Sequence, residues 1–259
     1  MTLQLLVAAM NKEAMELAQE MQIESDAIIV SQCNHYSYEE ILYKEHKIRC
    51  FAMAEKGVGL SRNTSLMRAD ADIILFADED IVYQEGYAEA VLQEFASHPK
   101  ADMLLFNVKA VPGRETYHTE SFGRVRWYNC GRYPTYSFAV RREKIHKNNI
   151  TFSLLFGGGA KYSNGEDSLF IRDCLKKGLK VYKTPVSIGA EKERPSTWFQ
   201  GYNEKFFFDR GVLYSHLYGG LNRIMGLRFL WVHRDELCKE IPLKKAYGIM
   251  VRGMKEGKC

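Results

Sequence analysis

The sequence predicts an α/β fold, in which a mostly parallel sheet is flanked by helices and followed by a helical C-terminal tail. In the first half of the chain, short apolar runs of strand length alternate with segments of helical periodicity, a pattern that indicates successive βαβ units. The chain has 259 residues, of which 46% are hydrophobic, so it can bury a substantial core. We therefore expect one α/β domain over residues 1–218 and a basic helical extension over residues 219–259.

The expected elements follow one another regularly up to residue 108. Strands are expected over residues 3–9, 27–31, 47–54, 73–77 and 103–108, and helices over residues 13–21 and 60–69. Apolar residues at positions 88, 91, 92 and 95 indicate a further helix, because this is the spacing of one buried helix face. The pattern then loosens. We expect a strand over 135–140, a helix over 168–177, a strand over 179–182 and a long aromatic helix over 198–218.

Composition argues against several classes of protein. The six cysteines are scattered without a CxxC pair, which argues against a disulfide scaffold or a zinc site and favours a reducing setting. The N-terminus lacks the basic region of a signal peptide, and no run approaches the roughly eighteen apolar residues of a membrane span. A formal charge of +4 is too small to indicate nucleic-acid binding. We expect a cytoplasmic protein, either soluble or peripheral on the inner face of the cytoplasmic membrane.

The positive charge is concentrated in the tail. Residues 219–259 contain nine Lys or Arg and four acidic residues, so the rest of the chain is close to neutral. Aromatic and aliphatic residues are interleaved with the cations in the segment LNRIMGLRFLWVHR. Such a segment can lie on an anionic membrane surface, pack on the domain with a solvated basic face, or pair with another copy of the chain. The sequence leaves these three interpretations open.

Two carboxylates follow directly on the apolar run IILF. Asp78 and Asp80 are two residues apart, and in extended chain such residues point to the same side. Their oxygens suit Mg²⁺ or Mn²⁺, and we expect Glu79 to point the other way. Asp70 and Asp72 have the same spacing but precede the strand, whereas ligands of open sheets bind beyond the carboxyl ends of strands. The alternative is that these acids only solvate a loop.

The segment KGVGLSRN at residues 56–63 precedes the helix that leads to this strand. A glycine-containing loop at the start of a helix offers free backbone N–H groups to an anion, and Lys56 and Arg62 add positive charge. The segment matches neither the P-loop nor the dinucleotide-binding fingerprint. Because Gly-x-Gly before a helix is often a simple turn, it indicates an anion site only in combination with the acidic triplet.

The order of these segments resembles glycosyltransferase family 2. In that family a glycine-containing segment that ends in Arg-Asn leads into the strand bearing a metal-binding DxD, as KGVGLSRN leads here into ADEDIVY. The resemblance continues through GEDSLFIRDCLKKGLKVYKTP and STWFQGYNEKFFFDRG and covers the chain to about residue 218. It is strongest to short bacterial members associated with capsule, exopolysaccharide or lipopolysaccharide assembly.

The resemblance implies a GT-A fold and a metal-dependent glycosyltransferase of hexosyltransferase type. The donor would be a nucleotide-diphosphate sugar, most often a UDP-sugar, and the acceptor a saccharide or a lipid-linked saccharide. The transfer would invert the anomeric carbon and serve bacterial surface polysaccharide synthesis. Residues 1–108 would form the nucleotide-binding half of the domain and residues 109–218 the acceptor half.

The family's site residues carry over onto matching positions of this sequence. Asp80 would be the main ligand of Mn²⁺ or Mg²⁺, and Asp78 would lie near the ribose or the metal. Many members end the second strand with an acidic pair that binds the base; this chain has Ser31-Gln32, and the Gln32 amide can both donate and accept. The other expected nucleotide-binding residues are Asn11, Lys56, Gly57, Arg62 and Asn63.

Glu166 and Asp167 open the helix that follows Gly165. Acidic residues are favoured at helix N-termini, so capping explains them without any function. Inverting transfer also needs a carboxylate that takes the proton of the acceptor hydroxyl, on a part of the chain remote from the metal ligands. The family's ED motif falls here, and the resemblance makes Asp167 the base with Glu166 as an acceptor-site partner. Gly158 and Gly159 would bring backbone close to the donor sugar or form a flexible loop.

Aromatic residues crowd the segment 198–208. Core packing explains most of them, and Trp198 is the expected platform for a sugar ring. Two other functions stay open. A sugar-phosphate nucleotidyltransferase would carry a glycine-rich loop directly after the first strand, where this chain reads AAMNK. A non-catalytic nucleotide- or carbohydrate-binding protein would not need the intact Asp78, Asp80 and Asp167.

Overall fold

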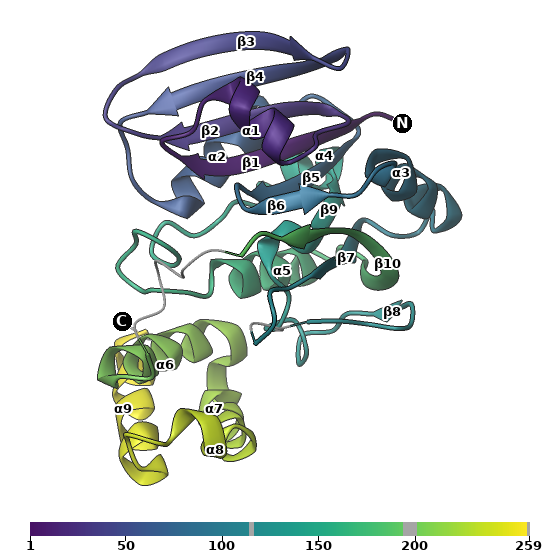
Figure 1. Cartoon of the computed structure of the whole chain (residues 1–259). Helices are drawn as coiled ribbons and strands as arrows, with labels where there is room; N and C mark the ends of the chain where they lie inside the picture. The colour runs from purple at the N-terminus through teal and green to yellow at the C-terminus, as the bar shows by residue number, and fades with distance from the viewer. Residues whose placement is uncertain (114–116, 194–200, 258–259) are drawn as a thin grey trace.

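The computed structural model describes residues 1–113, 117–193 and 201–257. It contains a central sheet with helices on both faces and a group of helices below it (Figure 1). The strands are β1 (Leu3–Met10), β2 (Asp26–Gln32), β3 (Ser37–Tyr43), β4 (His46–Met53), β5 (Ile73–Asp78), β6 (Ile81–Tyr83), β7 (Met103–Lys109), β8 (Gly123–Arg124), β9 (Phe138–Arg141) and β10 (Val181–Glu191). The helices are α1 (Ala14–Glu20), α2 (Val58–Arg68), α3 (Tyr87–Ser97), α4 (Arg142–Lys147), α5 (Glu166–Lys176), α6 (Glu204–Tyr218), α7 (Asn222–Val232), α8 (Arg234–Leu237) and α9 (Leu243–Glu256), with the 3₁₀ turns η1 (Thr135–Ser137) and η2 (Gly219–Leu221).

The sheet has the strand order β3-β4-β2-β1-β5-β9-β7-β10-β6, with β8 beside β10. Its first half is parallel as expected, because β4, β2, β1 and β5 pair in parallel. The second half is mixed: β7 and β10 pair in parallel, but β9 runs antiparallel between β5 and β7, and β6 and β8 pair antiparallel with β10. The prediction of a mostly parallel sheet therefore holds for strands β4, β2, β1 and β5, and the described sheet as a whole is mixed.

Strand β3 was absent from the sequence prediction. It forms a hairpin with β4 through Lys44 and Glu45, whose φ angles are 45° and 69°. Positive φ at both central residues is the geometry of a type I′ turn, which Asn-Gly or Asp-Gly usually marks in a sequence. Because Lys-Glu gives no such signal and β3 is largely exposed, neither turn chemistry nor alternation reveals the strand.

Two apolar clusters cover the two faces of the sheet. Helices α1 and α3 contribute to one of them, and α2, α4 and α5 contribute to the other. Strand β1 is buried at every position from Leu3 to Ala9, as a central strand covered on both faces should be. This arrangement fixes the carboxyl ends of β1, β2 and β5 at one edge of the sheet, beside the first turns of α2 and α5.

A third apolar cluster joins α6 to the tail helices. Helix α6 packs on α9 at very short range: a Cβ added to Gly211 would lie 2.1 Å from the Met250 carbonyl oxygen. The expected boundary at residue 218 therefore falls inside a packed unit, since α6 shares its core with the extension. None of the helices in the described part of the chain is both long and apolar enough to cross a membrane.

Candidate active site

A cavity of about 470 Å³ lies at the carboxyl edge of the parallel half-sheet. The first half of the chain lines it with residues 8–10, Gln32, Val58, Arg62, Asp78 and Glu79. The second half contributes Gly158 and residues 163–167. Ligands of open α/β sheets bind at this edge, so the cavity is where the fold itself predicts a site.

Arg62 connects the two sides of the cavity. Its side chain is only 4% exposed, and it donates to Asp78 Oδ1 at 2.8 Å and to Glu166 Oε1 at 2.9 Å. Burial alone would lower the pKa of Arg62, but the two carboxylates outweigh it and raise that pKa above its ordinary value. Since Asp78 ends β5 and Glu166 begins α5, one guanidinium ties the strand edge to the helix start.

Asp167 stands beside this ion network. It lines the cavity, and its Oδ1 accepts hydrogen bonds from the Ser168 N–H at 2.5 Å and the Ser168 hydroxyl at 3.1 Å. Burial, and then the negative charge of Glu166, raise the pKa of Asp167 to about 6, against the opposing influence of Ser168 and Arg62. A carboxylate with such a pKa is ionised at neutral pH and more basic than a surface aspartate, which suits it to accept a proton.

The acidic triplet departs from extended geometry. Strand β5 ends at Asp78, and Glu79 and Asp80 form a turn before β6. The prediction that Glu79 points away was wrong: it lines the same cavity as Asp78, and its Oε2 accepts from the Met10 N–H at 2.7 Å. Asp80 is half-buried, and its carbonyl accepts from the Lys192 N–H at 2.7 Å. The alternation of a strand fails here because the chain has already turned.

The donor chemistry at this edge fits a hard divalent ion that a ligand helps to hold. Among the described residues, no group of three or more His, Cys, Asp or Glu is placed to bind a metal by itself. Mg²⁺ is commonly bound through one or two carboxylates together with substrate phosphates. Asp78 lines the cavity and can supply oxygen ligands to such an ion, whereas Asp80, the expected main ligand, is not among the lining residues.

The loop of residues 157–159 closes the cavity by direct contact with the start of α2. The Val58 N–H donates to the Gly158 carbonyl at 3.0 Å, and the Gly57 N–H donates to Gln32 Oε1 at 2.8 Å. Gly157 has φ 104°, and a Cβ there would lie 2.8 Å from the Glu166 carboxyl carbon. A side chain at position 157 would therefore push against the residue that pairs with Arg62.

Comparison with known proteins agrees with this arrangement. The model of the family described as glycosyl transferase family 2 matches residues 18–158. The chain belongs to this family. As a family 2 member it is a glycosyltransferase, and the matched segment contains KGVGLSRN at residues 56–63, which includes Arg62, and the acidic triplet. No curated protein sequence matches the chain.

Solved structures share the fold of this family 2 glycosyltransferase across nearly its whole length. Staphylococcus aureus TarS 1–349 has a TM-score of 0.64 at 14% identity, with 99% of this chain and 82% of that one covered. Its complex with UDP-GlcNAc gives 0.64 at 15%, covering 99% and 78%. Mannosyltransferase PcManGT from Pyrobaculum calidifontis, in complex with GDP-Man and Mn²⁺, gives 0.55 at 10%, covering 99% and 87%. These likenesses confirm the expected GT-A fold.

The other expected site residues of the glycosyltransferase lie outside the lining of this cavity. Asn63 uses both amide atoms on the Phe152 backbone, at 2.9 and 2.7 Å, so it holds the acceptor-half loop against α2. Asn11 is exposed with φ 52°, and its N–H donates to the Gln32 carbonyl at 3.0 Å. Lys56 is exposed, and Trp198 lies outside the described residues.

Sequence reasoning missed two polar residues of the site. Ser163 and Asn164 line the cavity, and the buried Asn164 Oδ1 has no hydrogen-bond donor among the described residues. They lie directly before Gly165, so the same segment that drew attention to Glu166 and Asp167 contained the signal. A buried acceptor without a partner is costly, and a hydroxyl of a bound ligand would satisfy it.

Proposed function

We propose that the chain transfers a sugar from a nucleotide diphosphate to a hydroxyl of a saccharide acceptor, with inversion and with Asp167 as the base. The observation that carries the proposal is the shared cavity, in which the Asp78 edge of the sheet and the Asp167 helix face one space. Arg62 links the two. The proposal requires a base across the reacting sugar from the diphosphate-binding edge; that Asp78 and Asp167 line one cavity from different elements supports it.

The donor side would bind the nucleotide at the ends of β1, β2 and β5. The similar proteins support a nucleotide sugar, because TarS was solved with UDP-GlcNAc and PcManGT with GDP-Man and Mn²⁺. A UDP-sugar is our first choice. Gln32 accepts from the Gly57 N–H through its carbonyl oxygen, so its NH₂ group is the part that would meet a carbonyl of the base.

Asp80 and Asp78 would hold Mn²⁺ or Mg²⁺ together with the diphosphate oxygens. Such an ion supplies charge neutralisation for the departing diphosphate. The chain's own contribution is the buried Arg62, which holds Asp78 at the cavity and Glu166 beside Asp167. The negative charge of Glu166 contributes, after burial, to the raised pKa of Asp167.

On the acceptor side, Asp167 would take the proton of the attacking hydroxyl. The oxygen of that hydroxyl forms the new bond to the anomeric carbon while the bond to the diphosphate breaks. The proton remains on Asp167 and is then lost to water. General-base catalysis of this kind contributes about 10²–10⁴ in rate.

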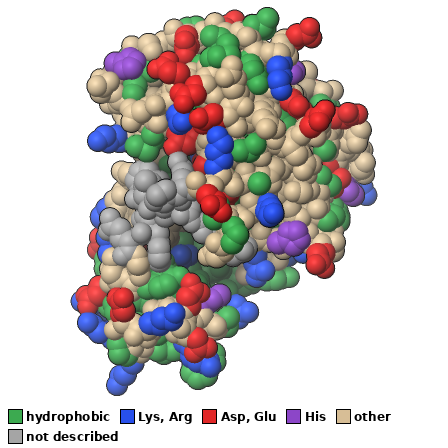
Figure 2. All heavy atoms as spheres, in the orientation of Figure 1, with side chains coloured by type: hydrophobic (Ala, Val, Ile, Leu, Met, Phe, Trp, Pro, Cys, Tyr) green, Lys and Arg blue, Asp and Glu red, His purple; other side chains and the backbone are tan. Residues whose placement is uncertain are grey.

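The acceptor and its location are proposed from the tail. Helix α7 exposes a row of apolar side chains, among them Ile224 at 66% and Trp231 at 60%, and Arg223 and Arg228 lie in the same helix. Figure 2 shows hydrophobic side chains beside Lys and Arg at the lower end of the molecule, where the tail helices lie. This combination supports peripheral contact with an anionic membrane and a lipid-linked acceptor of bacterial surface polysaccharide synthesis. The alternative is that the exposed apolar side chains of α7 form an interface with a second copy of the chain.

Calorimetric titration with UDP-, GDP- and TDP-sugars, with and without Mn²⁺, tests the proposal. We expect one class of nucleotide sugar to bind, and Mn²⁺ to strengthen the binding. Asp80→Ala should remove the effect of Mn²⁺, whereas Asp70→Ala, in the acidic pair before β5, should leave it intact. Binding of no nucleotide sugar, or an undiminished Mn²⁺ effect in Asp80→Ala, would refute the proposed function.

A further inference from the structure

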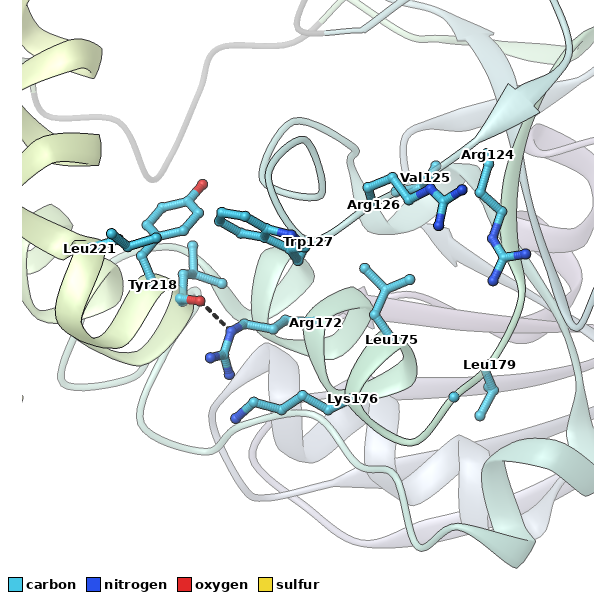
Figure 3. A pocket seen from close by; sticks show the side chains of 12 residues that line it. Arg124, Val125, Arg126, Trp127, Arg172, Leu175, Lys176, Leu179, Tyr218 and Leu221 are labelled. Atoms are coloured by element: carbon cyan, nitrogen blue, oxygen red, sulfur yellow. Dashed lines mark hydrogen bonds between the residues drawn. The ribbon is translucent and has the colours of Figure 1, made fainter.

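A second cavity, also about 470 Å³, lies at the opposite end of α5 from Asp167. It is bounded by residues 124–127, by the last turn of α5 and by the end of α6 with Leu221 (Figure 3). It shares no lining residue with the active-site cavity. The function proposed above makes no use of it.

The lining of the second cavity is cationic. Arg124, Arg126, Arg172 and Lys176 all contribute, and none of the described residues that line it is acidic. Within the described part of the chain, none of these four cations forms an ion pair. Burial, followed by the charges of Arg172 and Lys176, lowers the pKa of His216, while the charge of Asp173 opposes this shift. Clustered cations that form no ion pair favour the binding of an anion.

Two of the arginines are held in place. The Arg172 Nε donates to the Leu217 carbonyl, which directs the rest of the guanidinium toward Lys176 (Figure 3). Arg124 donates to the Tyr182 hydroxyl at 3.2 Å and lies over the Tyr182 ring, while its buried Nε has no acceptor in the described structure. Guanidinium groups fixed in this way lose little freedom when they bind an anion such as phosphate.

An aromatic surface stands beside the cations. Trp127 lines the cavity, is 51% exposed and lies next to Tyr218 in Figure 3. Core packing does not explain an indole with that exposure. Amphipathic aromatic faces are suited to contact with the apolar face of a ring. The cavity therefore combines anion-binding groups with a surface on which a sugar can stack.

The second cavity is close to the proposed base. Arg172 and Lys176 follow Asp167 by five and nine residues in one helix, or about 7 to 14 Å at 1.5 Å per residue. Gly131 lies between the two regions: a Cβ added there would be 3.6 Å from the Tyr218 hydroxyl and 3.7 Å from the Ser168 hydroxyl. An acceptor long enough to span the distance along α5 would contact both ends of this helix.

We propose that this second cavity binds a phosphate-bearing sugar of the acceptor, with the phosphate on Arg172 and Lys176 and the sugar against Trp127. The inference rests on the proposed function, because it gives the acceptor class for that reaction. It adds that the acceptor is anionic and that it is recognised at a site distinct from the donor cavity.

Calorimetry with glucose 1-phosphate, glucose and inorganic phosphate, in the presence of saturating nucleotide, tests the site. We expect glucose 1-phosphate to bind at least about tenfold more tightly than glucose, since hydrogen bonds to an ionised group are roughly twice as strong as neutral ones. Lys176→Glu should weaken that binding about tenfold or more. Trp127→Ala should weaken the binding of glucose 1-phosphate but leave the binding of inorganic phosphate unchanged.

Lys177→Glu is the matched control, because Lys177 is the exposed neighbour of Lys176 and does not line the cavity. Equal weakening by Lys176→Glu and Lys177→Glu would indicate general surface charge and overturn the inference. So would binding of glucose 1-phosphate no tighter than that of glucose.

Two further arms identify the source of the phosphate and separate this inference from the proposed function. A short alkyl chain on the phosphate strengthens binding if the acceptor is lipid-linked, because Leu221 lines the cavity and is 47% exposed; equal affinities indicate a lipid-free phosphosaccharide. Donor binding is measured in the same variants. Lys176→Glu should keep it at the wild-type level, whereas failure of the proposed function would show as no donor binding in any protein.

Discussion

Replacing Asp167 with Asn separates catalysis from helix capping at one residue. The Asn carbonyl still accepts from the Ser168 N–H and hydroxyl, so the hydrogen bonds at the start of α5 are retained. What is lost is the negative charge and the ability to take up a proton. If Asp167 is the base, the substitution abolishes transfer and leaves the fold intact; if it is only a helix cap, transfer is retained as long as the protein folds.

The expected effect on stability follows from the pKa. Its rise from 3.8 to about 6 means that ionised Asp167 opposes folding by up to about 3 kcal/mol, at ~1.4 kcal/mol for each pKa unit. Between about pH 4 and 6 the folded protein binds more protons than the unfolded chain, so the wild type loses stability as the pH rises through this window. Asp167→Asn removes that loss. We expect the free energy of unfolding of Asp167→Asn to exceed that of the wild type by about 1–3 kcal/mol at pH 8, with little difference at pH 4.

Urea unfolding at the two pH values measures this difference, and calorimetry with the donor shows whether the cavity is intact. Transfer activity should fall by about 10²–10⁴ in Asp167→Asn, and wild-type activity should rise with pH to a plateau above about 6. An Asp167→Asn protein that is less stable than the wild type at pH 8 would contradict the reasoning and support the capping role. Transfer within tenfold of the wild type would remove Asp167 as the base.

Three further substitutions test the surroundings of the site. Arg62→Met leaves two carboxylates without their buried partner and should cost about 3–5 kcal/mol in urea unfolding. Gly157→Ala combines a positive φ with a steric clash and should cost more than 1 kcal/mol, whereas Gly178→Ala, where φ is positive and no atom lies within 4 Å, isolates the backbone cost. Gly211→Ala should separate α6 from α9 and lower the melting temperature. Its control is Gly248→Ala, in open space on α9, which should stabilise the protein by about 1 kcal/mol. Equal effects of Gly157→Ala and Gly178→Ala, or of Gly211→Ala and Gly248→Ala, would contradict the packing described.

The sequence predicted the parallel half of the fold well because three of its strands, β1, β2 and β5, are buried on both faces. Continuous apolar runs such as those of β1 and β5 can be recognised without knowing their neighbours. Strand β10 was expected over residues 179–182 and extends over Val181–Glu191. Pro185 and the irregular pairing between Lys183 and Gly189 interrupt the alternation on which a strand prediction depends.

The site was predictable as single residues but not as a network. Asp78 and Asp167 could be singled out from their positions after a strand and at a helix start. The contact of Arg62 with Glu166 joins residues 104 positions apart, and no local pattern reports such a pair. The orientation of Glu79 was missed for a different reason: extended chain was assumed through residues 78–80, but β5 ends at Asp78 and the next two residues form a turn.

The close approach of α6 and α9 makes the end of the chain part of the support for α5, the helix that carries the proposed base. A Cβ at Gly165 would lie 2.6 Å from Leu213 of α6, so the residue that precedes Glu166 rests directly on that helix. Helix α6 is covered in turn by α9. A chain shortened after residue 218 would expose the inner face of α6 and loosen the surface under Gly165. Tolerance to truncation should therefore be low at the C-terminus, even though its last helix lies far along the sequence from every carboxylate in the cavity.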